Sequence, residues 1–184
     1  MEISWNKVNN DLQDVRSRTE QLINGLSPEQ LTRRPDPSKW SIAECLVHLN
    51  LTASSIQKLI GSAIQRGKAD KITGQGPFKP GGLGRLLIWI AEPPPKFKIK
   101  APAGILPPAN IGDPSAVVAE FLRVQDEWAR LVQEADGLDL NKIKAKMGFP
   151  GLPPIRLGAT IPWMMAHQRR HLLQAEGVKQ QVCN

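Results

Sequence analysis

With 184 residues, the chain is long enough for one domain with a substantial core, and its two cysteines are too few for a disulfide framework. The longest apolar run, residues 86–91, is too short to cross a bilayer, and the first residues lack the pattern of a signal peptide. We therefore expect a single domain over residues 1–184 in a reducing cytoplasm, without a membrane partner, and a net charge of +7 that permits an anionic ligand.

Three helical segments are predicted in the first third of the chain. Apolar residues at three- and four-residue steps from Ser4 to Ile23 indicate an amphipathic helix, and Ser27-Pro28 indicates a short helical turn that runs to Leu31. Ser41-Ile42-Ala43-Glu44 matches a capping box, in which each of the two polar side chains accepts a hydrogen bond from the other residue's backbone N–H. The helix that begins there carries an apolar stripe and is predicted to run to about Arg66.

A long irregular segment, residues 67–112, follows this helix and is rich in proline and glycine. Within it we expect a short helix at residues 83–91 and an extended piece at residues 96–100. Residues 66–100 contain eight basic and two acidic residues, a local net charge of +6 that accounts for most of the excess. This basic segment can steer an anionic ligand or contact phosphate, although a solvated loop without a partner is the simpler interpretation.

Two further long helices complete the predicted architecture. Asp113-Pro114 supplies a cap and a first-turn proline for the third long helix, which Gly137 ends. The last helix is predicted to begin at a Thr160 cap, and residues 178–184 are predicted to form a loose tail. Four long amphipathic helices, with one long crossover between the second and the third, describe an all-α four-helix bundle.

The chain contains only three histidines, and their spacing indicates a metal site. His167 and His171 are four residues apart in the last helix, so both imidazoles project from one face. His48, in the helix that begins at Ser41, can supply a third ligand from a neighbouring helix. Neutral imidazole suits zinc, nickel, copper and iron(II), so the residues indicate a class of metal rather than one ion. The alternative for each residue is a hydrogen-bonded core histidine.

The candidate site lacks a recognisable general base. In zinc metalloproteases a glutamate directly follows the first histidine of the helix, whereas Gln168 occupies that position here and cannot accept a proton. Glu44 lies one helical turn before His48, but we assign it to the capping box. All three histidines are already assigned, so no Ser/His/Asp or Cys/His nucleophile set can be recognised. The nucleophile would then be water or a thiol activated by the metal.

Two histidine-containing motifs occur in a fixed order along the chain. Residues 40–50 read Trp-Ser-Ile-Ala-Glu-Cys-Leu-Val-His-Leu-Asn, and residues 166–172 read Ala-His-Gln-Arg-Arg-His-Leu. Together with residues 31–35 and 100–102, they resemble the DinB-like (damage-inducible) superfamily over almost the whole chain. The resemblance implies an up-down-down-up bundle, often dimeric, with a divalent metal held by the three motif histidines. In this chain they are His48, His167 and His171.

The resemblance also suggests an activity. Characterised relatives include thiol-dependent S-transferases and a mycothiol-dependent isomerase, so we expect a metal-dependent hydrolase or thiol S-transferase acting on a small molecule. Zinc or nickel is the expected metal, a low-molecular-weight thiol is a candidate cofactor, and a homodimer is the expected assembly. Asn50, Arg170 and Gln174 are candidate substrate-binding residues, although an ion-pair role is equally open for Arg170.

Two other functions compete with the enzyme. A non-catalytic metal-binding or stress-response protein is the closer alternative, because no general base is recognised. Nucleic-acid binding by the basic crossover is disfavoured, because the sequence contains no recognition helix, zinc finger or aromatic sheet motif.

Overall fold

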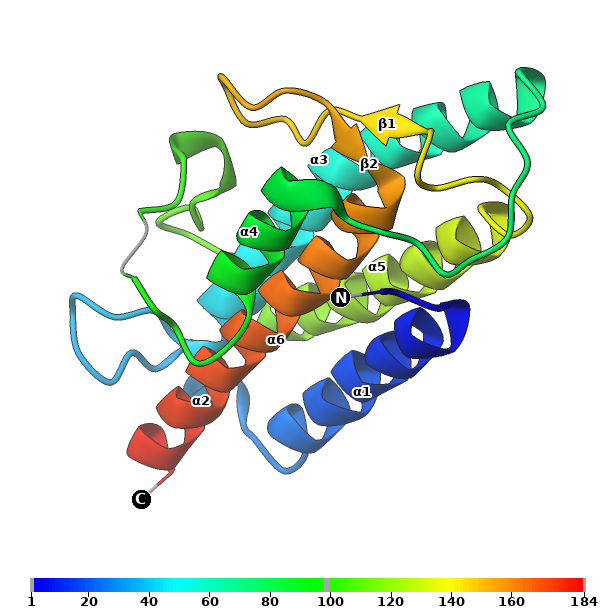
Figure 1. The fold of residues 1–184 in the computed structure, drawn as a ribbon. Helices are drawn as coiled ribbons and strands as arrows, with labels where there is room; N and C mark the ends of the chain where they lie inside the picture. Colours follow the sequence, from blue (N-terminus) through cyan, green and yellow to red (C-terminus); the bar gives the residue numbers. More distant parts are fainter. Residues whose placement is uncertain (1, 98–99, 184) are drawn as a thin grey trace.

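The computed structural model describes residues 2–97 and 100–183, and its four long helices form a bundle (Figure 1). These helices are α1 (Trp5–Ile23), α3 (Ile42–Ala69), α5 (Pro114–Glu134) and α6 (Leu157–Val182). α3 packs against α5 and α6, and α1 packs against the same two helices. α3 and α5 run in one direction and α1 and α6 in the other (Figure 1). The predicted all-α up-down-down-up bundle is confirmed.

Shorter elements lie between the long helices. α2 (Pro28–Thr32) follows α1, while α4 (Gly81–Ala91) and the 3₁₀ turn η1 (Ala103–Ile105) belong to the crossover. The strands β1 (Lys144–Ala145) and β2 (Ile155–Arg156) pair antiparallel just before α6. The sequence pattern does not predict this ribbon, because strands of two residues are too short to show an alternation.

Serine side chains cap two of the long helices, and the cap of α3 is the one that the sequence predicts. The Ser4 hydroxyl accepts a hydrogen bond from the Lys7 N–H at 3.3 Å and caps α1. At the start of α3, the Ser41 hydroxyl accepts from the Glu44 N–H at 3.2 Å, and the Glu44 carboxylate accepts from the Ser41 N–H at 2.8 Å. Arg34 forms an ion pair with the same carboxylate. The structural role predicted for Glu44 is therefore confirmed.

Two predictions about the last helix are wrong. α6 begins at Leu157 rather than at a Thr160 cap, because the Leu157 N–H donates to the Ile143 carbonyl at 2.9 Å and the next N–H is also satisfied. With its first donors bonded to the preceding segment, the helix needs no side-chain cap. The tail predicted from residue 178 is also wrong for residues 178–182. α6 continues to Val182 because Val178 and Val182 are buried in the core.

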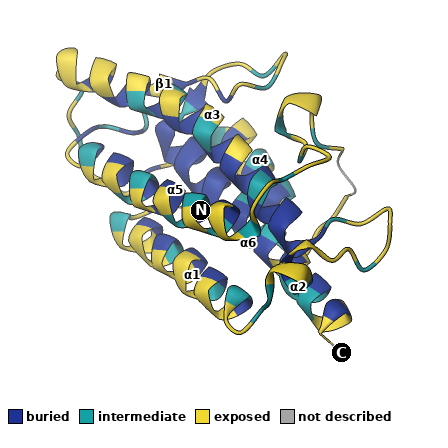
Figure 2. Ribbon diagram, turned by 180° about the vertical axis from the view of Figure 1, so that it is seen from behind, coloured by how far each residue is buried: buried dark blue, intermediate teal, exposed yellow. Residues whose placement is uncertain are grey.

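The hydrophobic core runs along the facing sides of the helices (Figure 2). Trp128 and Phe121 of α5 and the small Cys45 of α3 are fully buried in it. Burial raises the pKa of the Cys45 thiol to about 12, so this cysteine stays protonated and unreactive. Among the described residues, no helix combines the length and the apolar character needed to span a bilayer.

Described parts of the crossover are attached to the rest of the chain at separate points. Ile3 and Phe78 exchange backbone hydrogen bonds of 2.9 and 2.8 Å near its start. Further along, the Arg169 guanidinium of α6 donates to the Glu92 carboxylate at 2.7 and 2.9 Å. The predicted short helix is present as α4, whereas the predicted extended piece at residues 96–100 lies partly outside the described residues. The crossover therefore holds defined positions against α6.

The contact between α4 and α6 gives the first testable prediction. A Cβ atom on Gly84 would lie 2.5 Å from the Cβ of Ala159 and 3.2 Å from that of Pro80. Because the two helices cannot keep this spacing, we expect Gly84→Ala to lower the free energy of unfolding by about 1–3 kcal/mol. Gly82→Ala is the matched control, since a Cβ there meets no atom within 4 Å. Urea unfolding compares the two, and equal stability would contradict the close contact.

Candidate metal centre

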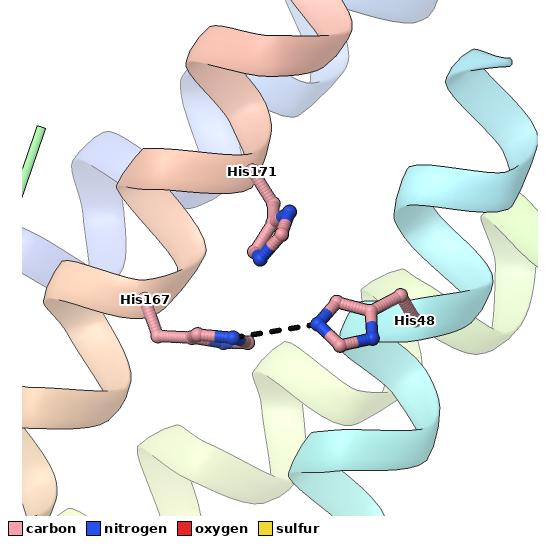
Figure 3. Close-up of side chains that lie close together, drawn as sticks. All are labelled: His48, His167 and His171. Carbon is pink, nitrogen blue, oxygen red and sulfur yellow. Dashed lines mark hydrogen bonds between the residues drawn. The ribbon is translucent and has the colours of Figure 1, made fainter. Parts of the chain in front are cut away.

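The three histidines of the chain meet between α3 and α6 (Figure 3). One ligand atom from each of His48, His167 and His171 lies within 4.8 Å of the others. The Nε2 atoms of His48 and His167 are 3.4 Å apart, and the His171 ring centroid lies 4.5 and 4.6 Å from those of the other two rings. The structure thus brings together the three residues that the sequence singles out, although His48 and His167 are 119 residues apart in the chain.

The spacing of these nitrogens suits a small divalent ion. Two nitrogen ligands at about 2.0–2.1 Å from zinc, separated by a tetrahedral angle, lie about 3.3 Å apart. The Nε2 atoms of His48 and His167 are already at that distance. Within the described part of the chain, no carboxylate or thiol joins the three imidazoles in this cluster. An all-nitrogen ligand set suits zinc, nickel, copper or iron(II) better than magnesium or calcium.

Hydrogen bonds hold two of the rings with Nε2 facing the centre. His48 Nδ1 lies 2.7 Å from the Ile105 carbonyl oxygen, which can only accept, so Nδ1 carries the proton. His171 Nδ1 donates in the same way to Oε1 of Gln174 at 3.0 Å. Such outer hydrogen bonds are typical of histidines that bind metals through the opposite nitrogen. Nδ1 of His167 has no hydrogen-bond partner in the part of the chain that is described.

Burial keeps the three imidazoles neutral. Desolvation, followed by the repulsion that a protonated His171 would meet from a protonated His48, lowers the pKa of His171 to about 3. Desolvation and the corresponding repulsion from His171 hold the pKa of His167 well below its ordinary value. The pKa of His48 is also lowered by burial, although its hydrogen bond to Ile105 opposes the shift. The neutral form is the one that binds a metal, so protons do not compete for these ligands near pH 7.

Two tryptophans flank the histidines. The Trp40 ring centroid lies 5.1 Å from that of His48 and 6.0 Å from that of His171. Trp163, one turn before His167 on α6, stacks on that imidazole at 5.1 Å and an interplanar angle of 17°. These rings restrict rotation of the imidazoles and cover them with apolar surface. The sequence pattern assigns neither tryptophan a role, although the four-residue spacing of Trp163 and His167 places them on one face.

The three predicted substrate-binding residues have different surroundings. The Asn50 amide donates to the Val117 carbonyl at 3.2 Å and so joins α3 to α5. Arg170 donates to two backbone carbonyls of the crossover, at 3.0 and 2.7 Å, and holds that segment against α6. The Gln174 side chain lies next to the histidine cluster, where its Oε1 accepts the hydrogen bond from His171 Nδ1. A role toward a substrate stays a prediction for all three residues.

Comparisons with known proteins agree with this fold and these motifs. A family model described as the DinB superfamily matches residues 11–175. The uncharacterized protein YuaE of Bacillus subtilis (strain 168) is 22% identical over 169 residues, which cover 92% of this chain and 95% of that protein. No solved structure gives a significant match.

Proposed function

The chain belongs to the DinB superfamily, and from that membership we propose that it is a metal-dependent enzyme whose three histidines hold a divalent ion. The observation that carries the proposal is the convergence of His48, His167 and His171, two of them with Nδ1 already engaged. Three protein ligands are the number found in catalytic zinc sites, where a further position stays open. Zinc or nickel is the ion that we propose.

The proposed reaction is attack by water or a low-molecular-weight thiol on an electrophilic small molecule, as in a hydrolase or a thiol S-transferase. The new O–C or S–C bond replaces the bond to a leaving group, which departs as halide or as the alcohol of an ester, and the proton of the nucleophile passes to solvent or to that alcohol. A divalent ion supplies the lowered pKa that makes either nucleophile available near pH 7. The chain positions the ligands through Ile105 and Gln174 and shields them from water with Trp40 and Trp163. Glu44 is committed to its capping box, so we assign no general base.

The charge at the centre favours an anionic substrate or a thiolate. Among the described residues, the cluster contains neutral imidazoles and no carboxylate, so these ligands would leave the two positive charges of an ion unbalanced. Arg170 adds to the positive potential, since its charge lowers the pKa values of His167 and His171. A small molecule with a carboxylate or phosphate beside its electrophilic atom is therefore the proposed class.

A metal-binding protein without turnover is the second candidate. It is favoured by the lack of a carboxylate in the histidine cluster, as far as the described residues show. Either protein can be a homodimer, which we retain as a prediction that sedimentation of the parent protein tests.

Turnover of a thiol with an electrophile separates the two candidates. We expect the protein loaded with zinc or nickel to turn over an electrophilic ester or halide. Attack by a thiol is measured by loss of free thiol, and attack by water by release of acid. His171→Ala should fall to the uncatalysed rate while its circular dichroism stays helical, because one ligand of the ion is missing. Gln181→Ala, on an exposed position of the same helix, is the control and should keep the parent rate. A metal-loaded parent without turnover across thiols and esters would favour the binding protein.

A further inference from the structure

One face of α4 is apolar and exposed, although α4 packs on α6 outside the four-helix bundle (Figure 1). Leu83, Leu86 and Trp89 follow one another at three-residue steps and are 41%, 50% and 51% exposed. Phe97, 53% exposed, lies beside the last of them, with its ring centroid 6.0 Å from that of Trp89. These four residues are here called the α4 face. The opposite side of the helix is buried through Gly84, Ile88 and Ala91.

The α4 face gathers most of the exposed large apolar side chains of the described structure. It holds four of seven such residues, and the others are Leu51, Leu106 and Leu173. A contiguous apolar patch of this kind on a folded domain marks a surface that meets a partner or a membrane, whereas single exposed leucines need no explanation.

Basic groups border both ends of the α4 face. At the N-terminus of α4, a pocket of about 380 Å³ is lined by three basic residues and one acidic residue: Lys79, Arg85, Arg156 and Glu2. No side chain caps this end of the helix, so its first N–H groups and the helix dipole add to the positive potential. At the other end, the Lys96 ammonium lies 5.6 Å from the Trp89 ring centroid. The patch therefore combines an apolar centre with a cationic border.

We propose that the α4 face docks on an anionic lipid surface. This proposal replaces the sequence-based expectation of no membrane partner, which rested on the absence of an apolar run long enough to cross a bilayer. Leucine, tryptophan and phenylalanine beside basic residues form the composition of helices that lie in the membrane interface. The apolar side chains would enter the boundary between headgroups and acyl chains, and the basic pocket would meet lipid phosphates. This contact is independent of the metal centre and of the proposed activity.

A second copy of the chain suits the α4 face less well. In a two-fold interface the same surface meets itself, so the cations at its border would face cations. Glu92 is the acidic residue between α4 and Phe97, and its carboxylate is already bound by Arg169. Glu2, in the basic pocket, lies 3.8 Å from the Lys79 ammonium and is paired with it. Both of these described carboxylates are therefore already engaged within the chain, whereas lipid phosphates can meet the remaining cations.

Vesicle flotation with the full chain tests the proposal. We expect binding to vesicles that contain phosphatidylglycerol to be about a hundredfold tighter than to phosphatidylcholine alone, because three or four basic side chains approach the headgroups. This binding should weaken as salt is added. Leu86→Ser combined with Trp89→Ser should weaken it by about tenfold or more, since both apolar side chains are removed from the interface.

A matched control and a second variant keep the test decisive. Leu51→Ser changes an equally apolar residue of α3, 38% exposed, and should bind like the parent. Arg85→Gln leaves the apolar side chains in place and should weaken binding about fivefold if the double variant does not fold. Equal binding to both vesicle types, or unchanged binding of the double variant, would overturn the proposal. So would a parent dimer that Leu86→Ser and Trp89→Ser dissociate, because the face would then belong to a second copy.

Discussion

His48→Ala is expected to remove stoichiometric metal from the protein while the helical fold persists. The parent, purified without a nickel column, should contain close to one equivalent of zinc, nickel or iron by mass spectrometry. Without His48 only the two ligands of α6 remain. Loss of a hydrogen-bond partner behind a ligand lowers metal affinity by up to about a hundredfold, so loss of the ligand itself should lower it by more than that. A parent that neither contains metal nor binds added zinc would leave three core histidines and contradict the proposed function.

Gln174→Leu is the graded companion of this experiment. It keeps all three imidazoles but removes the acceptor for His171 Nδ1, so we expect the affinity for zinc to fall by about 10- to 100-fold with an unchanged stoichiometry. Gln181→Leu changes an exposed residue two helical turns further along α6 and leaves that hydrogen bond intact. This variant should bind zinc like the parent. Equal affinities of the two variants would show that Gln174 does not position the ligand.

The metal-free protein is expected to lose stability as the pH falls from about 6.5 toward 3. The ordinary pKa of histidine is 6.5, whereas that of His171 in the folded protein is about 3. Between these values the unfolded chain binds more protons than the folded one, so protons favour unfolding. The stability contributed by the neutral ring is fully present above pH 6.5. Below that pH, one such group lowers the free energy of unfolding by about 1.4 kcal/mol for each pH unit. His167 and His48 shift in the same direction.

Urea unfolding as a function of pH measures this effect. Burial raises the pKa of the Glu44 carboxylate, but hydrogen bonds from Arg34 and Ser41 lower it overall below its ordinary 4.5. The interval between 6.5 and 4.5 therefore reports on the histidines rather than on this carboxylate. His171→Gln should flatten the slope there, because one titrating group is gone. If the stability of the parent were constant across that interval, the rings would take up protons in the folded protein as they do in the unfolded chain, which would contradict the lowered pKa values.

Much of the bundle could be predicted from local sequence chemistry. Ser4 and Ser41 begin their helices because a hydroxyl satisfies an N–H group within three residues, which is a property of the segment alone. The apolar stripes of the long helices likewise follow from a period of 3.6 residues. The pairing of His167 with His171 belongs to the same class, since four-residue spacing on a helix places both rings on one face.

Only the tertiary structure decided the features that depend on distant backbone. α6 begins at Leu157 because its N–H groups meet the carbonyls of Ile143 and Leu140, and no local capping signal precedes it. The Ile105 carbonyl that holds the His48 ring lies 57 residues away in the crossover, and a backbone acceptor carries no residue-specific signal. By itself, the sequence determined the long helical segments and the pairing of His167 with His171, because short-range geometry places them. The orientation of His48 required tertiary packing, because its hydrogen-bond partner is brought close only when the chain folds.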